Sequence, residues 1–163
     1  MEIKWAVGKA FKEACQSTSP STIVIPKGTF QMNQMKLEGP CKGPIELQIQ
    51  ATLKAPSDPN QIKTGEWLTV NKLDFFTMSG GGILDGQGKA AWECRESKKC
   101  TKLPNNLSFN SLTNSIIKDI TTLDNKSFHV NVNQCKNLTF LQFNVSAPAS
   151  PHLKIKLREC YRL

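Results

Sequence analysis

A short internal repeat in the second half of the chain restricts its fold more than any other feature. When the segment that begins at Asn114 is laid over the one that begins 23 residues later, Ile117 falls on Phe140. The residues between these apolar stretches are mostly Asn, Ser, Thr and Asp, which favour turns and break any helical periodicity. A repeat of this length is typical of one coil of a parallel β-helix, in which inward apolar side chains stack on those of the next coil.

Further patterns extend this interpretation along the chain. Residues 73–78 match residues 138–143 at an offset of 65 residues, close to three such coils, and residues 45–50 alternate between apolar and polar side chains. Val7 and Phe11 have helical spacing before a Ser-Thr-Ser-Pro stop, which predicts a short helix. The predicted fold class is therefore all-β: a right-handed parallel β-helix (solenoid), incomplete, with a short N-terminal capping helix. An ordinary β-sandwich with coincidental spacing is the alternative that periodicity alone leaves open.

The glycine-rich stretch 79–88 has two interpretations. Such a loop binds phosphate where it joins a strand to a helix and ends in Gly-Lys-Ser/Thr. That ending is missing, and residues 83–86 have the pattern of a strand and turn. We therefore expect these glycines to serve backbone bends between coils.

Composition favours one domain but leaves the compartment ambiguous. The chain has 163 residues, 39% of them hydrophobic, which is enough to bury one core. No apolar run is long enough to cross a membrane. The first eight residues lack the apolar region of a secretory signal, so the literal chain would be cytoplasmic.

Cysteines and sequons favour a secretory origin instead. Six cysteines is a high count for a cytosolic domain of this size, and none has the Cys-x-x-Cys spacing of a metal site. The candidate glycosylation sites, all Asn-x-Ser/Thr sequons, are Asn106, Asn125, Asn137 and Asn144.

The positions of the cysteines suggest two disulfides. Cys15 ends the predicted helix and Cys41 lies in a turn before a strand, so a bridge between them would tie the cap to the first coils. Cys94 and Cys100 flank a charged stretch and could pin an excursion loop. The two cysteines left over are Cys135 and Cys160.

Six segments of the chain form an ordered set: FKEAC at 11–15, IPKGTF at 25–30, LEGPC at 37–41, GGILDGQG at 81–88, LSFN at 107–110, and FHVNV at 128–132 through VSAP at 145–148. In these segments the chain resembles the plant polygalacturonases, especially the pollen-type exopolygalacturonases. The resemblance covers about residues 10–150, and the segments occur in family order. The resemblance implies a secreted right-handed parallel β-helix that hydrolyses α-1,4-linked galacturonic acid in cell-wall pectin, by inversion and without a metal or cofactor.

The catalytic segments of that family are not found in this sequence. In polygalacturonases they are an Asn-Thr-Asp segment, which follows the Ser-Ala-Pro stretch, an Asp-Asp pair, a Gly-His-Gly segment and an Arg-Ile-Lys segment. Here residues 145–151 lead straight into His-Leu-Lys-Ile-Lys, and none of the four segments is present. We therefore expect no catalytic residues, a family part at 1–150 followed by a basic non-family tail at 151–163, and an inactive chain. A scattered pair drawn from Asp85, Asp119 and Asp124 is a weaker source of acid and base.

Part of a substrate groove is still expected. If Val130 and Val132 point inward, then His129 and Asn131 point outward, on the type of strand that lines the family's cleft; a solvent-exposed His129 without a role is the simpler interpretation. The formal net charge of +8 suits pectin or polygalacturonate as partner, and neither nucleic acid nor a membrane is expected. A noncatalytic pectate-binding module and an unstable truncated gene product are the alternatives to an inactive polygalacturonase-like chain.

Overall fold

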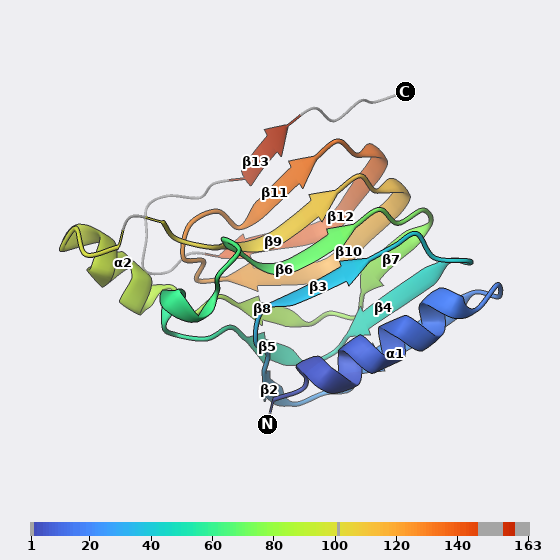
Figure 1. Ribbon diagram of the computed structural model, residues 1–163, viewed down its shortest axis with the longest axis horizontal. Helices are drawn as coiled ribbons and strands as arrows, with labels where there is room; N and C mark the ends of the chain where they lie inside the picture. The colour runs from blue at the N-terminus through green and yellow to red at the C-terminus, as the bar shows by residue number, and fades with distance from the viewer. Residues whose placement is uncertain (1, 101, 147–154, 159–163) are drawn as a thin grey trace.

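The structure is a computed structural model that describes residues 2–100 and 102–146 and the backbone of residues 155–158. Strands wind in successive coils, and each coil crosses from one sheet to the other (Figure 1). Every pairing between these strands is parallel, with neighbouring strands supplied by successive coils. The predicted parallel β-helix is confirmed, and the β-sandwich is excluded because its sheets would be antiparallel.

The larger sheet has eight strands and is bent. In earlier coils two short strands cross it, whereas β10 and β12 each span it with eleven residues, so the two arms of the sheet meet at β10. Its strands, in sheet order, are β1 (Ser21–Ile25), β4 (Ile45–Ile49), β7 (Phe76–Ser79), β10 (Thr113–Leu123), β8 (Ile83–Asp85), β5 (Thr52–Lys54) and β2 (Thr29–Gln31), with β12 (Lys136–Ser146) paired to β10.

The smaller sheet lies across the core from the larger one and carries the candidate site. Its strands, in sheet order, are β3 (Met35–Glu38), β6 (Glu66–Asn71), β9 (Asn105–Asn110), β11 (Val130–Asn133) and β13 (Ile155–Arg158). The strand β13 falls in the predicted tail and pairs in parallel with β11. Residues 147–154 and 159–163, which include Cys160, lie outside the described residues.

The register confirms the repeat found in the sequence and corrects the longer match. Ile117 pairs with Phe140, as the 23-residue offset predicts. Met78 pairs with Ile117, so β7 lies two coils before β12 and not three. The match at 65 residues was wrong because the coil between β7 and β10 is 39 residues long.

That long coil contains a helix that the sequence interpretation missed. Helix α2 (Lys89–Glu96) leaves the stack of coils, as Figure 1 shows at the left. Ala91 is buried, and the indole N–H of Trp92 donates to the backbone oxygen of Asn125. A disulfide from Cys94 to Cys100 closes the excursion.

Helix α1 (Lys4–Gln16) caps the first coil, as predicted. Val7, Phe11 and Ala14 are buried against the β-helix, and burial of each large apolar side chain contributes roughly 1.5–3 kcal/mol. A second disulfide joins Cys15 to Cys41 across 26 residues, which contributes about 3 kcal/mol by restricting the unfolded chain. The remaining helical turn is η1 (Pro59–Gln61). Among the described residues, neither helix has the length or apolar character of a membrane span.

Candidate functional site

The outward face of the smaller sheet carries two rows of polar side chains that cross the strands. Inward residues of these strands, such as Leu68 and Val70, are buried in the core. Because side chains alternate along a strand, the residues between them point outward and stack with their partners on the next strand. The first row is Lys36, Thr69, Ser108 and Asn131, and the second is Glu38, Asn71, Asn110 and Asn133.

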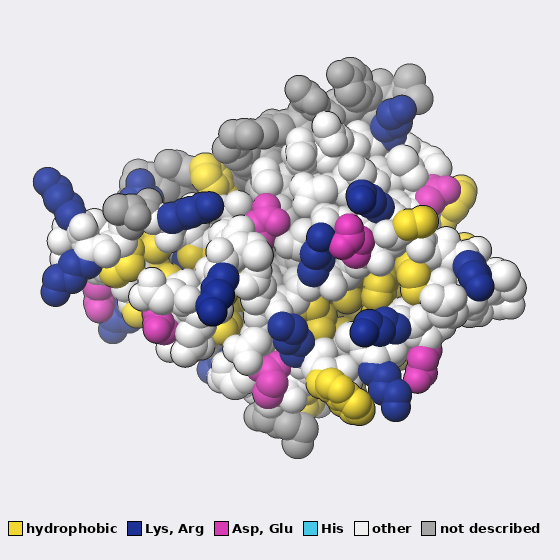
Figure 2. Space-filling view, in the orientation of Figure 1, with side chains coloured by type: hydrophobic (Ala, Val, Ile, Leu, Met, Phe, Trp, Pro, Cys, Tyr) yellow, Lys and Arg dark blue, Asp and Glu magenta, His cyan; other side chains and the backbone are white. Residues whose placement is uncertain are grey.

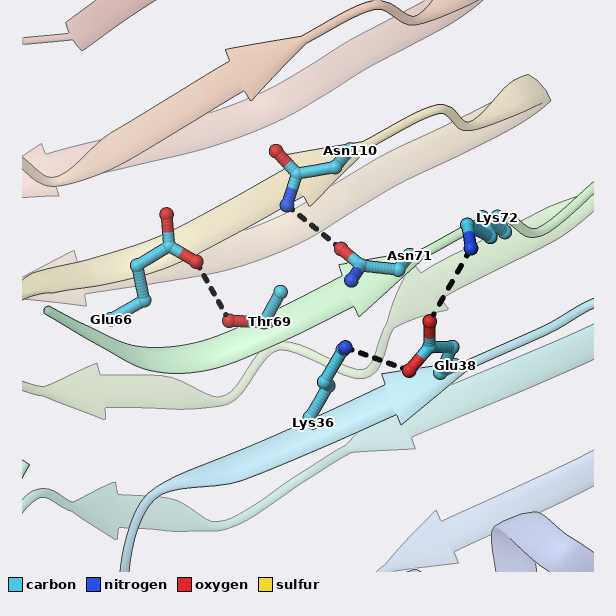
Figure 3. A network of polar contacts seen from close by, with 7 residues as sticks. All are labelled: Lys36, Glu38, Glu66, Thr69, Asn71, Lys72 and Asn110. Atoms are coloured by element: carbon cyan, nitrogen blue, oxygen red, sulfur yellow. Dashed lines mark hydrogen bonds and ion pairs between the residues drawn. The ribbon is translucent and has the colours of Figure 1, made fainter. Parts of the chain in front are cut away.

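Hydrogen bonds to Glu66 connect three side chains of the first row. Its carboxylate accepts a hydrogen bond from the hydroxyl of Thr69 at 3.0 Å and another from the hydroxyl of Ser108 at 2.7 Å. The side-chain amide of Asn131 donates to the Ser108 oxygen at 3.1 Å and lies 3.5 Å from the same carboxylate. We call these four residues the Glu66 cluster. Figure 3 shows its Glu66–Thr69 contact beside the second row.

The second row begins with an ion-paired carboxylate. Lys36 Nζ lies 2.7 Å and Lys72 Nζ 3.6 Å from the carboxylate of Glu38. The Lys36 hydrogen bond is the main reason that the pKa of Glu38 is lowered below its usual value. Further along, the amide of Asn110 donates to the amide oxygen of Asn71 at 2.7 Å (Figure 3).

A hollow lies between the two rows over β3 and β6. Its volume is about 210 Å³, and its walls include Lys36, Glu66, Thr69, Asn71 and Asn110. The walls therefore supply one ammonium group, one carboxylate, and several hydroxyl and amide groups. This set can form hydrogen bonds with sugar hydroxyls and one ion pair with an acidic sugar.

Asn131 points outward as predicted and joins the Glu66 cluster, but the outward placement of His129 was wrong. The imidazole is fully buried, Nδ1 lies 3.2 Å from the Thr122 hydroxyl, and burial lowers the pKa of His129 to about 4. Strand β11 begins only at Val130, so His129 belongs to the corner before the strand, where the alternation rule does not apply. Asn106, the second residue of β9, is also buried at this end of the sheet and donates to Thr122 at 3.0 Å. We call Asn106, Thr122 and His129 the corner network.

The four sequons also divide into exposed and buried asparagines. Asn137 and Asn144 are exposed on β12, and glycosylation there stays a prediction. Asn106 and Asn125 are each 1% exposed, so the predictions of glycosylation at these two positions are wrong for this fold. A glycan on either side chain would have to occupy space that the coils fill.

The carboxylates considered as substitutes for the family's acid and base do not lie in the Glu66 cluster. Asp85 accepts from the backbone N–H of Gln87, and Asp124 accepts from that of Gly88, in turns beside the two sheets. Asp119 is exposed on β10 of the larger sheet. No three His, Cys, Asp or Glu side chains among the described residues are grouped as metal ligands would be.

Two charged side chains in the structure, Lys126 and Glu66, were not singled out by the sequence analysis. Lys126 is 1% exposed and its ammonium donates to the backbone oxygen of Gly86; burial lowers its pKa to about 8, although Asp85 and Asp124 oppose that shift. Glu66 lies at the start of β6, where no motif marks it. The one available signal was the alternation of β6 and β9, which predicts that Thr69 and Ser108 share a face.

Comparison with known proteins agrees with the fold and gives a family. Residues 15–153 match the model of glycosyl hydrolases family 28. The chain is 84% identical over 149 residues to a polygalacturonase of Nicotiana tabacum, an alignment that covers 91% of this chain and 38% of the tobacco protein. It is 54% identical over 146 residues to an exopolygalacturonase of Oenothera organensis, covering 87% of this chain and 40% of that protein.

A solved structure with a similar fold is the crystal structure of endo-xylogalacturonan hydrolase from Aspergillus tubingensis. The TM-score is 0.78 at 22% sequence identity, over 93% of this chain and 41% of the fungal chain. The chain thus spans about two fifths of the relatives it matches.

Proposed function

Because the chain belongs to family 28 of the glycosyl hydrolases, we propose that it forms the first coils of a polygalacturonase β-helix. The outward face of its smaller sheet binds pectin, with polygalacturonate as the preferred part of that polymer. The observation that carries this proposal is the pair of polar rows that cross β3, β6, β9 and β11 beside the hollow at Glu66.

The rows suit an extended acidic polysaccharide. Adjacent strands are about 4.8 Å apart, so a polymer that lies across them meets a new polar side chain at each strand. Amide and hydroxyl groups such as those of Asn71 and Asn110 pair with sugar hydroxyls. Lys36 and Lys72 share one carboxylate, that of Glu38, so the pair carries a net positive charge and has ammonium hydrogens left for a uronate.

In this proposal the described face binds sugar and does not cleave it. Inversion requires one protonated acid and one base on opposite sides of the glycosidic bond. Glu38 is held ionised by Lys36, so it is a poor proton donor. The two carboxylate oxygens of Glu66 already accept from Thr69 and Ser108.

We also propose that the chain acts outside the cell, in the plant cell wall. Its two disulfides are stable in an oxidising compartment and would be reduced in the cytosol. The exposed sequons at Asn137 and Asn144 would accept glycans on the secretory pathway.

Two assays test the proposal. Calorimetric titration of polygalacturonate is expected to show saturable binding that the double change Asn71→Ala/Asn110→Ala weakens about tenfold, since two polar contacts are lost. Asn144→Ala, an exposed amide on the larger sheet, is the matched control and should bind like wild type. Equal binding by both variants would remove the groove from consideration.

Hydrolysis is measured separately, as reducing ends released from polygalacturonate by the purified chain. We expect no release above the rate without protein. Clear turnover that survives repurification would contradict the proposal that this face only binds.

A further inference from the structure

We propose that the outward face of α1 is a second contact for an acidic polysaccharide, outside the groove on the smaller sheet. This surface consists of Lys4, Trp5, Gly8, Lys9 and Lys12, and we call it the Trp5 hollow. The chemistry of the surface calls for a polymer of uronic acids. That the polymer is polygalacturonate rests on the proposed function.

The first observation is an exposed aromatic ring among ammonium groups. Trp5 is 77% exposed, and the ammonium of Lys9 lies 5.4 Å from the centre of its ring. A hollow of about 380 Å³ adjoins both side chains. In the lower right of Figure 2, where α1 lies, a hydrophobic group stands beside several Lys or Arg side chains.

The second observation is the glycine at the floor of the hollow. Gly8 lies in the middle of α1, where glycine is less favourable than alanine. No neighbour explains it, because an added Cβ would meet no atom within 4 Å, and its backbone is not in the left-handed region. What the missing side chain does provide is open space beside Trp5.

The third observation is the sign of the charge. Lys4, Lys9 and Lys12 are all exposed. The carboxylate of Glu2 accepts from the backbone N–H groups of Lys4 and Asn33, so its charge is held at the helix start. Glu13 is the exposed acid that follows Lys12, which leaves an excess of positive charge around the indole ring.

This combination favours a polyuronate over a membrane or a nucleic acid. Membrane helices insert an apolar face, but Val7, Phe11 and Ala14 of α1 are already buried against the β-helix. Single-stranded nucleic acids stack successive bases on several aromatic rings, and this face offers one. A sugar ring needs only one indole for its C–H face, while its carboxylates pair with the lysines around it.

The location of α1 lets the Trp5 hollow act together with the groove on the smaller sheet. The helix packs beside β3, the first strand of the smaller sheet, in Figure 1. A polymer that crosses β9, β6 and β3 in turn therefore leaves the groove next to α1. A long polymer can reach both surfaces, whereas a short oligomer occupies the groove alone, so the Trp5 hollow selects for chain length.

The test compares affinities for long polygalacturonate and for a trimer of galacturonic acid. Trp5→Ala and the double change Lys9→Ala/Lys12→Ala are each expected to weaken binding of the long polymer about fivefold or more and to leave the trimer unchanged. The matched controls are Phe75→Ala, which removes an exposed ring on another face, and Lys27→Ala/Lys99→Ala, which removes two exposed charges elsewhere. Both controls should bind the polymer like wild type.

Gly8→Ala separates binding from folding. It should raise the melting temperature, because alanine favours the helix, and it should weaken polymer binding by filling the hollow. A variant that is more stable yet binds less well cannot owe its defect to unfolding. Unchanged binding by Gly8→Ala together with Trp5→Ala would overturn the inference.

Further arms distinguish this inference from the proposed function. If the α1 variants match wild type while the Asn71/Asn110 variant is impaired, the groove stands and the Trp5 hollow is rejected. If polygalacturonate does not bind at all, alginate, another polyuronate, is titrated with the same variants. A loss specific to the α1 variants would keep the hollow, and its absence would reject it. Equal dependence on Trp5 for anionic vesicles or single-stranded DNA would also overturn the assignment to a polysaccharide.

Discussion

The Glu66 cluster and the corner network contain the same kinds of side chain but face opposite ways. In the cluster, hydroxyl and amide groups surround a carboxylate on the side of the smaller sheet that faces away from the core, where Thr69 and Ser108 are nevertheless buried. In the corner network, Thr122 links the amide of Asn106 to the ring of His129 inside the β-helix. The comparison teaches that polarity alone does not mark a binding face in a solenoid. Direction relative to the core separates the two sets, and Glu66 and Asn131 are the half-buried members of the outer one, so inner groups should affect stability and outer groups should affect binding.

The largest effect is expected from Lys126, which is buried close to the corner network. Lys126→Ala should lower the free energy of unfolding by about 3 kcal/mol, because it leaves a cavity and removes the donor to the Gly86 oxygen. Lys126→Met keeps most of the volume without a buried charge and should cost less. Urea denaturation measures both, and Lys99→Ala serves as an exposed control. Equal stability of Lys126→Ala and wild type would contradict the inner role.

The next effect is the pH dependence that His129 introduces. Its folded pKa is about 4 and its unfolded value 6.5, so the unfolded chain binds the extra proton between these values. Stability should therefore fall as the pH drops from 6.5 to 4, by roughly 2.5 kcal/mol from this residue. The difference in unfolding free energy between His129→Gln and wild type, followed across this range, isolates the effect from that of the carboxylates. A constant difference would show that the ring is not buried neutral.

Thr122→Val examines the hydrogen bonds of the corner network at constant shape. The change should cost about 1.5 kcal/mol, because Asn106 and His129 each lose a buried partner. Polygalacturonate affinity should stay at the wild-type value. A loss of affinity without a loss of stability would break the distinction between inner and outer polar groups.

The smallest change in stability is expected on the outer face. Glu66→Gln should cost about 1 kcal/mol, since the half-buried amide keeps one of the two accepting oxygens. Its effect on polygalacturonate affinity should exceed its effect on the melting temperature. Thermal melts and titrations on the same preparation provide the comparison, and a severe melt shift would place Glu66 with the structural groups.

The sequence predicted the stack of coils better than it predicted the corners. Ile117 and Phe140 were aligned correctly because apolar side chains must stack at equal heights in adjacent coils. The alternation rule also placed Asn131 on the outer face. It failed at His129 because the rule holds only inside a strand, and the start of β11 depends on how the corner packs. Asn106 and Asn125 are buried, which their sequons could not show, because a sequon does not indicate which way its Asn points.

The coil that leaves the stack was the second feature that the sequence did not predict in full. The match of residues 73–78 to 138–143 assumed equal coils. Cys94 and Cys100 suggested an excursion loop, but nothing local in residues 89–96 predicts that it begins as a helix. The Glu66 cluster depends on contacts across 42 residues between Glu66 and Ser108, which only the correct register of coils brings together. Sequence patterns therefore predicted the architecture and the outward direction of Asn131, while the contacts that organise the Glu66 cluster required the structure.

The long coil that carries α2 bears on how such a protein can change. Strand β7 pairs with β10 before the excursion, and β9 pairs with β6 after it, so the ladders on both sides stay in register. The Cys94–Cys100 disulfide closes the added segment on itself. A β-helix built in this way accepts new sequence at its turns without a change in the register of its core strands. This excursion is therefore a natural place for an inserted tag, a reporter or a further binding loop.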